Sequence, residues 1–255
     1  MSVWDLYESR INTRGVTRRG TQLLREKRFL STKLPNSLSY HTVAIDSVEQ
    51  NVAIIDTDNL DTKFIYSIPG EDIRHGGLVE WNDYYWLITE RDANNEVYTR
   101  AKMVQCNYLL RWIDSNADIH EQWCIIEDGT KYLTGELEDK DYIITRGDSR
   151  ISMTIAKNEY TAAMNRTNRF LIDDPASPHM LAYSLTKPLK LGGWFNDNGV
   201  YSFVLQEVQT TDFDNQELRV ADYYKYFPKE PVEIPPELPR PGETSGSSEG
   251  RKVWF

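Results

Sequence analysis

Two adjacent stretches with strand-like patterns decide the fold class: LVEWNDYYWLITERD at 78–92 and EVYTRAKMVQCNYLLRWID at 96–114. Both are rich in the β-branched and aromatic residues that favour strands. Asn94 and Asn95 lie between them and tolerate the backbone conformations of a tight turn, so the sequence predicts an antiparallel hairpin here. The alternation over 97–104 predicts one buried face, whereas the apolar run 108–113 predicts burial on both faces.

Shorter segments of the same kind precede this hairpin. The segments 40–45, NVAIID at 51–56 and KFIYSI at 63–68 are each bounded by Asp, Asn, Pro or Gly, which is typical of strands joined by turns. Residues 34–116 are therefore predicted to form a small barrel or open sheet of about five strands.

A second β unit is predicted over residues 117–228. Three hairpin turns are indicated at Asp128-Gly129, at Gly147-Asp148 and at 196–199, each with strand-like segments on both sides. This spacing is typical of a sandwich or barrel of about seven strands, the size of an immunoglobulin-like module. The predicted class is mainly β: a small barrel-like N-terminal domain, then an immunoglobulin-like β-sandwich or barrel, with a short helical arm in front.

The charge of the chain is unevenly distributed. Its 255 residues contain 29 Lys and Arg against 39 Asp and Glu, a formal net charge of −10. Residues 1–33 contain eight basic and three acidic side chains, a charge of +5, which leaves −15 for the other 222 residues. Trp4 belongs to an apolar pattern with helical spacing, so residues 1–33 are predicted to form a basic, partly helical arm. Four interpretations of this arm stay open: a solvated extension, a helix packed on the acidic body of its own chain, a segment that docks on an acidic partner, or a nucleic-acid contact. The arm residues predicted to bind a partner are Trp4, Arg18, Arg19, Arg25 and Arg28.

Residues 229–255 differ in composition from everything before them. The segment PKEPVEIPPELPRPGETSGSSEG has the composition of a linker, and the chain then ends in Arg-Lys-Val-Trp-Phe. An aromatic pair beyond a linker favours a docking peptide, so Val253, Trp254 and Phe255 are predicted to bind another subunit or protein.

No catalytic pattern is found in the sequence. The four histidines are scattered, and no Cys or His group has the spacing of a four-ligand zinc site. Cys106 and Cys124 are expected to be buried, small apolar residues in strands. The sequence therefore predicts no catalytic residue, no metal and no cofactor, and a protein that is not an enzyme.

The expected compartment is a reducing cytoplasm. No apolar run approaches the roughly 20 residues of a membrane span, and the first ten residues lack the pattern of a secretory leader. Two cysteines in the whole chain are typical of that compartment. The acidic body would repel a phosphate backbone, so the arm is the part of the chain suited to contact DNA.

The run 75–114, with LPNSLSYH (34–41) before it and HEQWCIIEDGTKYLTGE (120–136) after it, resembles virion proteins of tailed bacteriophages from Gram-positive, gut-type hosts. This resemblance covers most of residues 34–228. It implies a structural virion protein, synthesised in the bacterial cytoplasm, that acts as a head-tail connector. Such an adaptor or head-closure protein forms a homo-oligomeric ring between the portal and the tail proteins, and genomic DNA passes through its lumen without sequence-specific binding.

Two alternatives to the connector stay open. The size of the second β unit also suits a tail-terminator or collar protein. The chain could instead be a receptor- or carbohydrate-binding module on the tail or capsid surface, with aromatic side chains near the hairpin ends that stack on sugars. The candidate stacking residues are Trp81, Tyr84, Trp86, Trp194 and Phe195.

Overall fold

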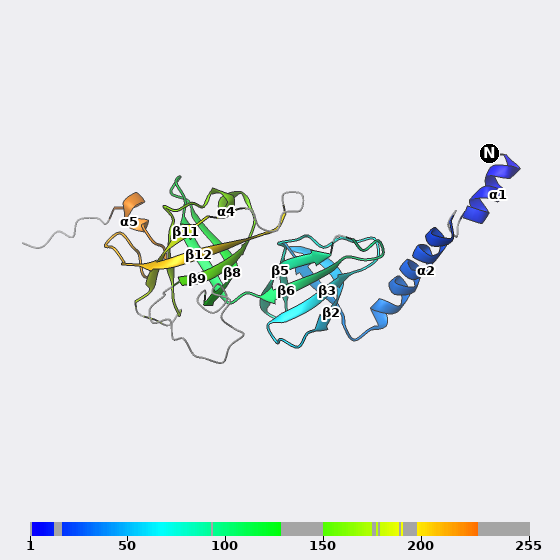
Figure 1. The fold of residues 1–255 in the computed structure, drawn as a ribbon, viewed down its shortest axis with the longest axis horizontal. Coiled ribbons are helices and arrows are strands. Elements are labelled where there is room, and N and C mark those ends of the chain that lie inside the picture. The colour runs from blue at the N-terminus through cyan, green and yellow to red at the C-terminus, as the bar shows by residue number, and fades with distance from the viewer. Residues whose placement is uncertain are drawn as a thin grey trace, which may run out of the picture.

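The computed structural model describes residues 2–12, 17–92, 94–128, 150–174, 177, 179–188, 190 and 198–228. Figure 1 shows three parts in a row along the longest axis: a helical arm, a first β-barrel and a second, barrel-like sheet. The predicted class, mainly β with a short helical N-terminal arm, is confirmed. Among the described helices, none has the length and apolar character needed to cross a bilayer.

Two helices form the arm, α1 (Val3–Asn12) and α2 (Arg18–Lys33), and the short 3-10 helix η1 (Leu34–Asn36) leads to the first strand. Thr17 caps α2, because its Oγ1 accepts a hydrogen bond at 3.0 Å from the backbone N–H of Gly20, which the first turn leaves without a helical partner. Gly20 lies inside this helix and does not interrupt it.

Six described strands close the first barrel in the order β1-β2-β3-β6-β5-β4, with every neighbouring pair antiparallel. They are β1 (Tyr40–Ile45), β2 (Val48–Asp56), β3 (Thr62–Ser67), β4 (Leu78–Trp81), β5 (Tyr84–Asp92) and β6 (Arg100–Gln105). Strand β4 pairs with β1 and so closes the ring. The centre is filled by alternate side chains such as Ile65, Ile88 and Met103, which are fully buried.

Two tight turns of this barrel place both central residues in the left-handed region. Asp46 and Ser47, between β1 and β2, have φ values of 49° and 68°, and Asn82 and Asp83, between β4 and β5, have values of 52° and 64°. This is the pattern of a type I′ hairpin turn, which Asn and Asp tolerate. The stretch 78–92 therefore contains a hairpin of two strands, where the sequence predicted one long strand. The predicted pairing across Asn94 and Asn95 is confirmed as the β5–β6 pair.

Six described strands also form the second sheet, in the order β10-β11-β12-β9-β8-β7. They are β7 (Tyr108–Ile113), β8 (Ile119–Asp128), β9 (Arg150–Ala156), β10 (Arg169–Ile172), β11 (Leu181–Lys187) and β12 (Val200–Val208). The edge strands β7 and β10 lie side by side, and the hydroxyl of Tyr108 donates a hydrogen bond at 3.0 Å to the carbonyl of Leu171. The described strands thus form one curled sheet, which is the barrel alternative rather than the two-sheet sandwich.

The core of the second sheet lies inside this curl, with Phe170, Phe203, Met153 and Ile155 fully buried. Two short helices, α4 (Glu159–Ala163) and α5 (Tyr223–Tyr226), accompany the sheet. The predicted strand segments 130–138 and 141–146, most of 187–195, and the whole of 229–255 lie outside the described residues.

The passage from the first unit to the second lies nearer the N-terminus than predicted. Strand β7 pairs with β8 of the second sheet, so the boundary expected after residue 116 is corrected to Cys106 and Asn107. The Asn107 side chain pairs with the backbone of Ile126, donating to its carbonyl at 2.7 Å and accepting from its N–H at 2.8 Å. This amide continues the ladder of the second sheet by one position. The apolar run 108–113 belongs to the second core, which a local pattern does not reveal.

The two barrels meet at an apolar junction. Leu87 and Cys106 from the first unit form a buried cluster with Ile125 from the second. Beside this cluster the rings of Tyr85 and Trp123 are stacked, with centroids 4.7 Å apart and 18° between their planes. Buried apolar area of this kind favours a fixed contact between the two units.

A side-chain hydrogen bond and a close backbone approach reinforce the junction next to this cluster. Nε of Arg74 donates a hydrogen bond at 2.8 Å to Oδ1 of Asn198. Gly76, with φ of 78°, lies so close to Gly199 that a Cβ atom on residue 76 would be 2.0 Å from the Gly199 carbonyl oxygen. Only a residue without a side chain fits at this position.

Candidate functional site

The described side chains of the arm are exposed or only partly buried. Every described side chain of α1 is exposed, and the exposed fractions of Val3 and Trp4 are 83% and 73%. The rings of Trp4 and Tyr7 contact each other at right angles, with centroids 5.9 Å apart. Covering this many exposed apolar side chains on one short helix with a partner surface is favourable in free energy.

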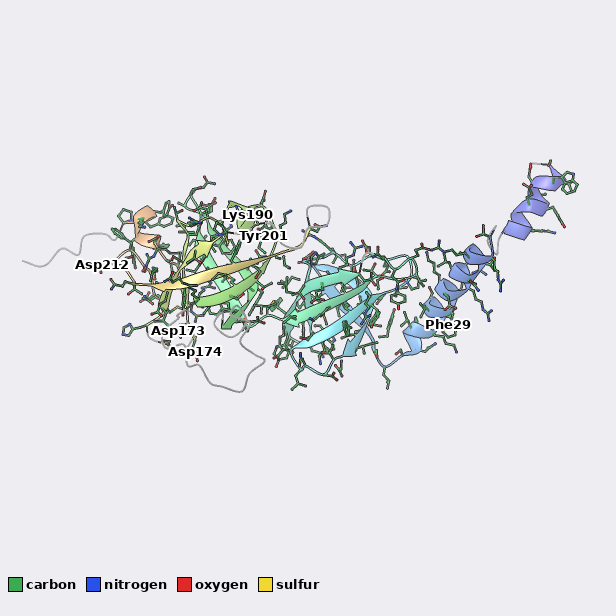
Figure 2. The ribbon with its side chains drawn as sticks, viewed as in Figure 1. Phe29, Asp173, Asp174, Lys190, Tyr201 and Asp212 are labelled. Carbon is green, nitrogen blue, oxygen red and sulfur yellow. The ribbon has the colours of Figure 1, made fainter. Side chains whose placement is uncertain are left out.

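Helix α2 also has no buried side chain among its described residues. Helical spacing places Arg18, Arg25 and Phe29 on one face, and Phe29, labelled in Figure 2, is 56% exposed. Half-buried Leu23 and Leu30 lie on the opposite face. The outer face of α2 therefore combines positive charge with an exposed aromatic ring.

An ion pair connects the arm to the first barrel: Nη2 of Arg19 lies 2.6 Å from Oε1 of Glu96, with both side chains mostly exposed. An exposed pair contributes little free energy, about 0–1 kcal/mol. Arg18, Arg25 and Arg28 form no ion pair with any residue in the described ranges. In the described structure, therefore, the basic helix as a whole does not pack on the acidic body of its own chain.

The other predicted partner-binding residues, Val253, Trp254 and Phe255, lie outside the described residues. So do the stacking candidates Trp194 and Phe195. The remaining stacking candidates do not form a platform: Trp86 is buried, Trp81 packs against it with ring centroids 5.8 Å apart, and Tyr84 is exposed.

A buried ionic corner in the second barrel was not predicted. The Arg169 guanidinium holds the Asp214 carboxylate with two hydrogen bonds of 2.9 and 3.0 Å, and it also contacts Asp222 at 2.7 Å. Burial favours the neutral form of Asp214. The backbone N–H groups of Asp222 and Thr211 and the guanidinium outweigh that effect, so the pKa of Asp214 lies below its ordinary value. Arg169 is more than 40 positions from Asp214 and Asp222, so no local pattern could have revealed the corner.

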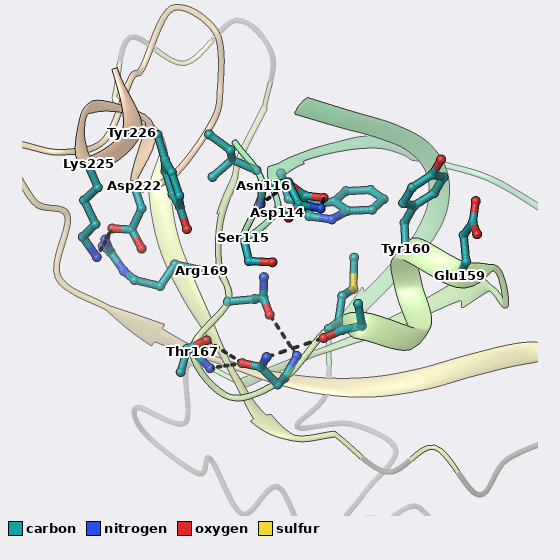
Figure 3. Close-up of a pocket in the computed structure, with 17 residues that line it drawn as sticks. Asp114, Ser115, Asn116, Glu159, Tyr160, Thr167, Arg169, Asp222, Lys225 and Tyr226 are labelled. Atoms are coloured by element: carbon teal, nitrogen blue, oxygen red, sulfur yellow. Dashed lines mark hydrogen bonds and ion pairs between the residues drawn. The ribbon is translucent and has the colours of Figure 1, made fainter. Parts of the chain in front are cut away.

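A pocket of about 450 Å³ opens beside this corner, at one end of the second barrel. Figure 3 shows Asp222 and Tyr226 on one side of it and Glu159 and Tyr160 on the other. Its lining comes from the β7–β8 turn, α4, the segment before β10, and α5. No local sequence pattern predicts this pocket, because its lining comes from segments far apart in the chain.

Both cysteines lie in buried positions near the junction and the second core. Burial raises the pKa of the Cys106 thiol to about 12, and it also raises the pKa of the Cys124 thiol. Within the described ranges, no group of three or more His, Cys, Asp or Glu side chains is placed to hold a metal ion.

We expect the native protein to react very slowly with a thiol reagent at neutral pH. The thiolate is the reactive form, and its fraction falls about tenfold for each unit by which the pKa rises. Both cysteines should react at the rate of a free thiol once the protein is unfolded in denaturant. Absorbance of the released thiol reagent measures this, and rapid labelling of the native protein would contradict the burial of Cys106 and Cys124.

The described chain is an elongated protein of two barrel-like β units that presents a basic, aromatic-bearing helical arm. Comparison with known families matches residues 7–105 to the YomX N-terminal domain. The matched range begins in α1 and ends at Gln105, the last residue of β6, so it covers most of the arm and all of the first barrel.

The chain is also similar to the "SPbeta prophage-derived uncharacterized protein YomX" of Bacillus subtilis (strain 168), with 36% identity over 66 residues. The match covers 25% of this chain and 31% of that protein, so the similarity spans less than a third of the relative. No solved structure matches the chain. Both matches point to YomX, and the matched relative is described as prophage-derived.

Proposed function

We propose that this protein is a non-enzymatic structural component of the phage particle, a head-tail connector of the adaptor or head-closure type. In this proposal, copies of the chain form a homo-oligomeric ring between the portal and the tail proteins. The observation that carries the proposal is the arm: its described side chains include none that is buried, and they present the exposed Trp4 and Phe29 together with Arg18, Arg25 and Arg28, which form no ion pair within the described ranges.

Ring assembly depends on how the subunits join. A ring is built from head-to-tail contacts, in which one surface of a subunit meets a different surface of its neighbour. The arm carries +5 and the rest of the chain −15, so an arm that reaches a neighbouring body gains favourable electrostatic interaction and buries its apolar side chains. The match of arm and first barrel as one unit supports a role in which the two act together.

The acidic charge of the body suits a conduit for DNA. Each phosphate that a protein neutralises adds salt-dependent affinity, which would hold the genome in place instead of letting it move. We therefore place acidic residues of the barrels along the lumen of the ring, where DNA passes without sequence-specific binding.

The test is charge reversal on the arm: Arg18, Arg19, Arg25 and Arg28, each changed to Glu. We expect the affinity between subunits in the ring, and their affinity for portal protein in co-sedimentation, to fall by about tenfold or more. The reason is that four surface attractions become repulsions of similar size. Light scattering coupled to gel filtration measures the assembly, and the unfolding midpoint should stay near that of the wild type because these side chains are exposed.

The matched control changes the same four arginines to Lys, which keeps the charge and should keep the assembly. A wild-type protein that stays monomeric at all concentrations and never co-purifies with portal or tail protein would contradict the connector proposal. If charge reversal instead abolishes tight, salt-dependent binding to DNA while assembly is unchanged, the arm is a nucleic-acid contact and not a docking segment.

A further inference from the structure

The pocket of the second barrel has an apolar floor between aromatic walls. Trp112 and Met164 line it and are almost completely buried, with 2% and 1% of their surface exposed. Tyr160 and Tyr226 keep 45% and 41% of theirs exposed, and Figure 3 shows them on opposite sides of the pocket. A volume of about 450 Å³ lies within the range of roughly 300–1,000 Å³ that is usual for binding pockets. The pocket is therefore suited to bulky apolar groups.

The charge that remains available at this pocket is negative. Its two cationic side chains, Arg169 and Lys225, are both held by Asp222, at 2.7 and 2.9 Å. Asp114 and Glu159 also line the pocket, and neither forms an ion pair with a Lys or Arg in the described ranges. A ligand with positive charge next to its apolar groups fits this distribution.

Asp114 is held in its ionised form. The backbone N–H of Asp118 donates to its carboxylate at 2.9 Å and that of Asn116 at 2.8 Å, and Nε2 of His120 lies 3.3 Å away. These contacts keep the pKa of Asp114 below its ordinary value, the hydrogen bond from Asp118 having the largest effect. The negative charge at this wall therefore persists at neutral pH.

One segment of this chain has the matching chemistry, and the chain leaves the described structure beside the pocket. Helix α5 contributes Tyr226 to the pocket wall, and the described residues end at 228. The 22 residues 229–250 then connect to Arg-Lys-Val-Trp-Phe at 251–255. A connection of this length spans at most roughly 75 Å, which suffices to reach the pocket of the same chain or of a neighbour.

We propose that this pocket is the receptor for the chain's own segment 251–255. Trp254 and Phe255 cover the floor formed by Trp112 and Met164 and contact the two tyrosine rings. Arg251 and Lys252 lie against Asp114 and Glu159. This proposal does not depend on the connector role, because the segment can come from the same chain or from a neighbouring copy.

The experiment uses the full-length protein with Trp254→Ala and Phe255→Ala, which frees the pocket, and a synthetic RKVWF peptide as the probe. We expect saturable peptide binding by isothermal titration calorimetry, and we expect none for the control peptide RKVAA. Tyr160→Ala in the same background should weaken binding by about tenfold, because an aromatic contact is lost. Glu159→Lys should weaken it as well, whereas Glu80→Lys on the exposed surface of the first barrel is the matched control and should leave it unchanged.

Each outcome of these measurements either supports or overturns the proposal. Absence of saturable binding, or binding that both pocket variants retain, would overturn the proposal, and so would binding of RKVAA as tight as that of RKVWF. If the mass of the protein in solution falls when Trp254→Ala and Phe255→Ala are introduced, the segment of one copy occupies the pocket of a neighbouring copy. If the mass is unchanged and the wild-type protein does not bind the added peptide, the segment occupies the pocket of its own chain. Tyr160 and Glu159 are exposed, so both variants should keep the wild-type unfolding midpoint.

Discussion

Replacement of Gly76 by alanine should destabilise the protein by about 2–4 kcal/mol, since it adds strain in the left-handed region to a clash that no rotamer relieves. The residue has φ of 78°, and its Cβ would stand 2.0 Å from the carbonyl oxygen of Gly199. That oxygen also accepts a hydrogen bond at 2.9 Å from the N–H of Lys157, so it is held in the second sheet. The two barrels would have to separate to admit a methyl group.

Chemical denaturation measures the loss of stability, and thiol labelling measures the opening of the junction. Cys106 belongs to the junction cluster, so its labelling should accelerate in Gly76→Ala under native conditions. Gly70→Ala is the matched control, because Gly70 also has a positive φ, 101°, but a Cβ there would meet nothing within 4 Å. It should cost only the conformational strain, about 1 kcal/mol, and leave Cys106 protected. Equal effects of the two substitutions would show that the close approach to Gly199 is unimportant.

The second large effect is expected for Asp214→Asn. The carboxylate of Asp214 is fully buried, holds Arg169 with two hydrogen bonds and accepts the backbone N–H of Thr211 at 2.7 Å and that of Asp222 at 2.9 Å. Asparagine keeps the shape but leaves the guanidinium without its main counter-charge and turns an amide donor toward other donors. Breaking a buried pair in this way costs about 3–5 kcal/mol. Asp212→Asn is the matched control, since Asp212, labelled in Figure 2, is exposed two residues away and should be nearly neutral.

Asp214 also predicts how stability depends on pH. Its pKa in the folded protein lies below the ordinary value of 3.8, so the contribution is fully present above that value and is lost as the pH falls through the folded pKa. The denaturation midpoint of the wild type should therefore fall below about pH 4, more steeply than that of Asp214→Asn. Asp114 shifts in the same direction, so the variant should keep part of this dependence. Identical pH profiles for the two proteins would contradict the assigned role of Asp214.

Local pattern revealed much of this fold. The strands around Ile65 and Met103 show the alternation that a one-sided barrel wall requires, and the excess of basic residues before position 34 indicated a basic, partly helical arm. The turn at Asn82 and Asp83 was missed because an apolar, aromatic context on both sides masked it. The same limitation placed the apolar run 108–113 in the wrong unit, since a segment buried on both faces looks alike in either core.

The sequence by itself determined the class of the protein, mainly β with a basic arm, because side-chain periodicity and charge are local properties. Tertiary structure alone decided that the two β units pack against each other, through Gly76 on Gly199 and Tyr85 on Trp123. It alone assembled the Arg169 corner and the pocket beside it. Each of these features joins residues about 40 to 120 positions apart, and contacts at that separation depend on strand order and closure, which no local window of the sequence contains.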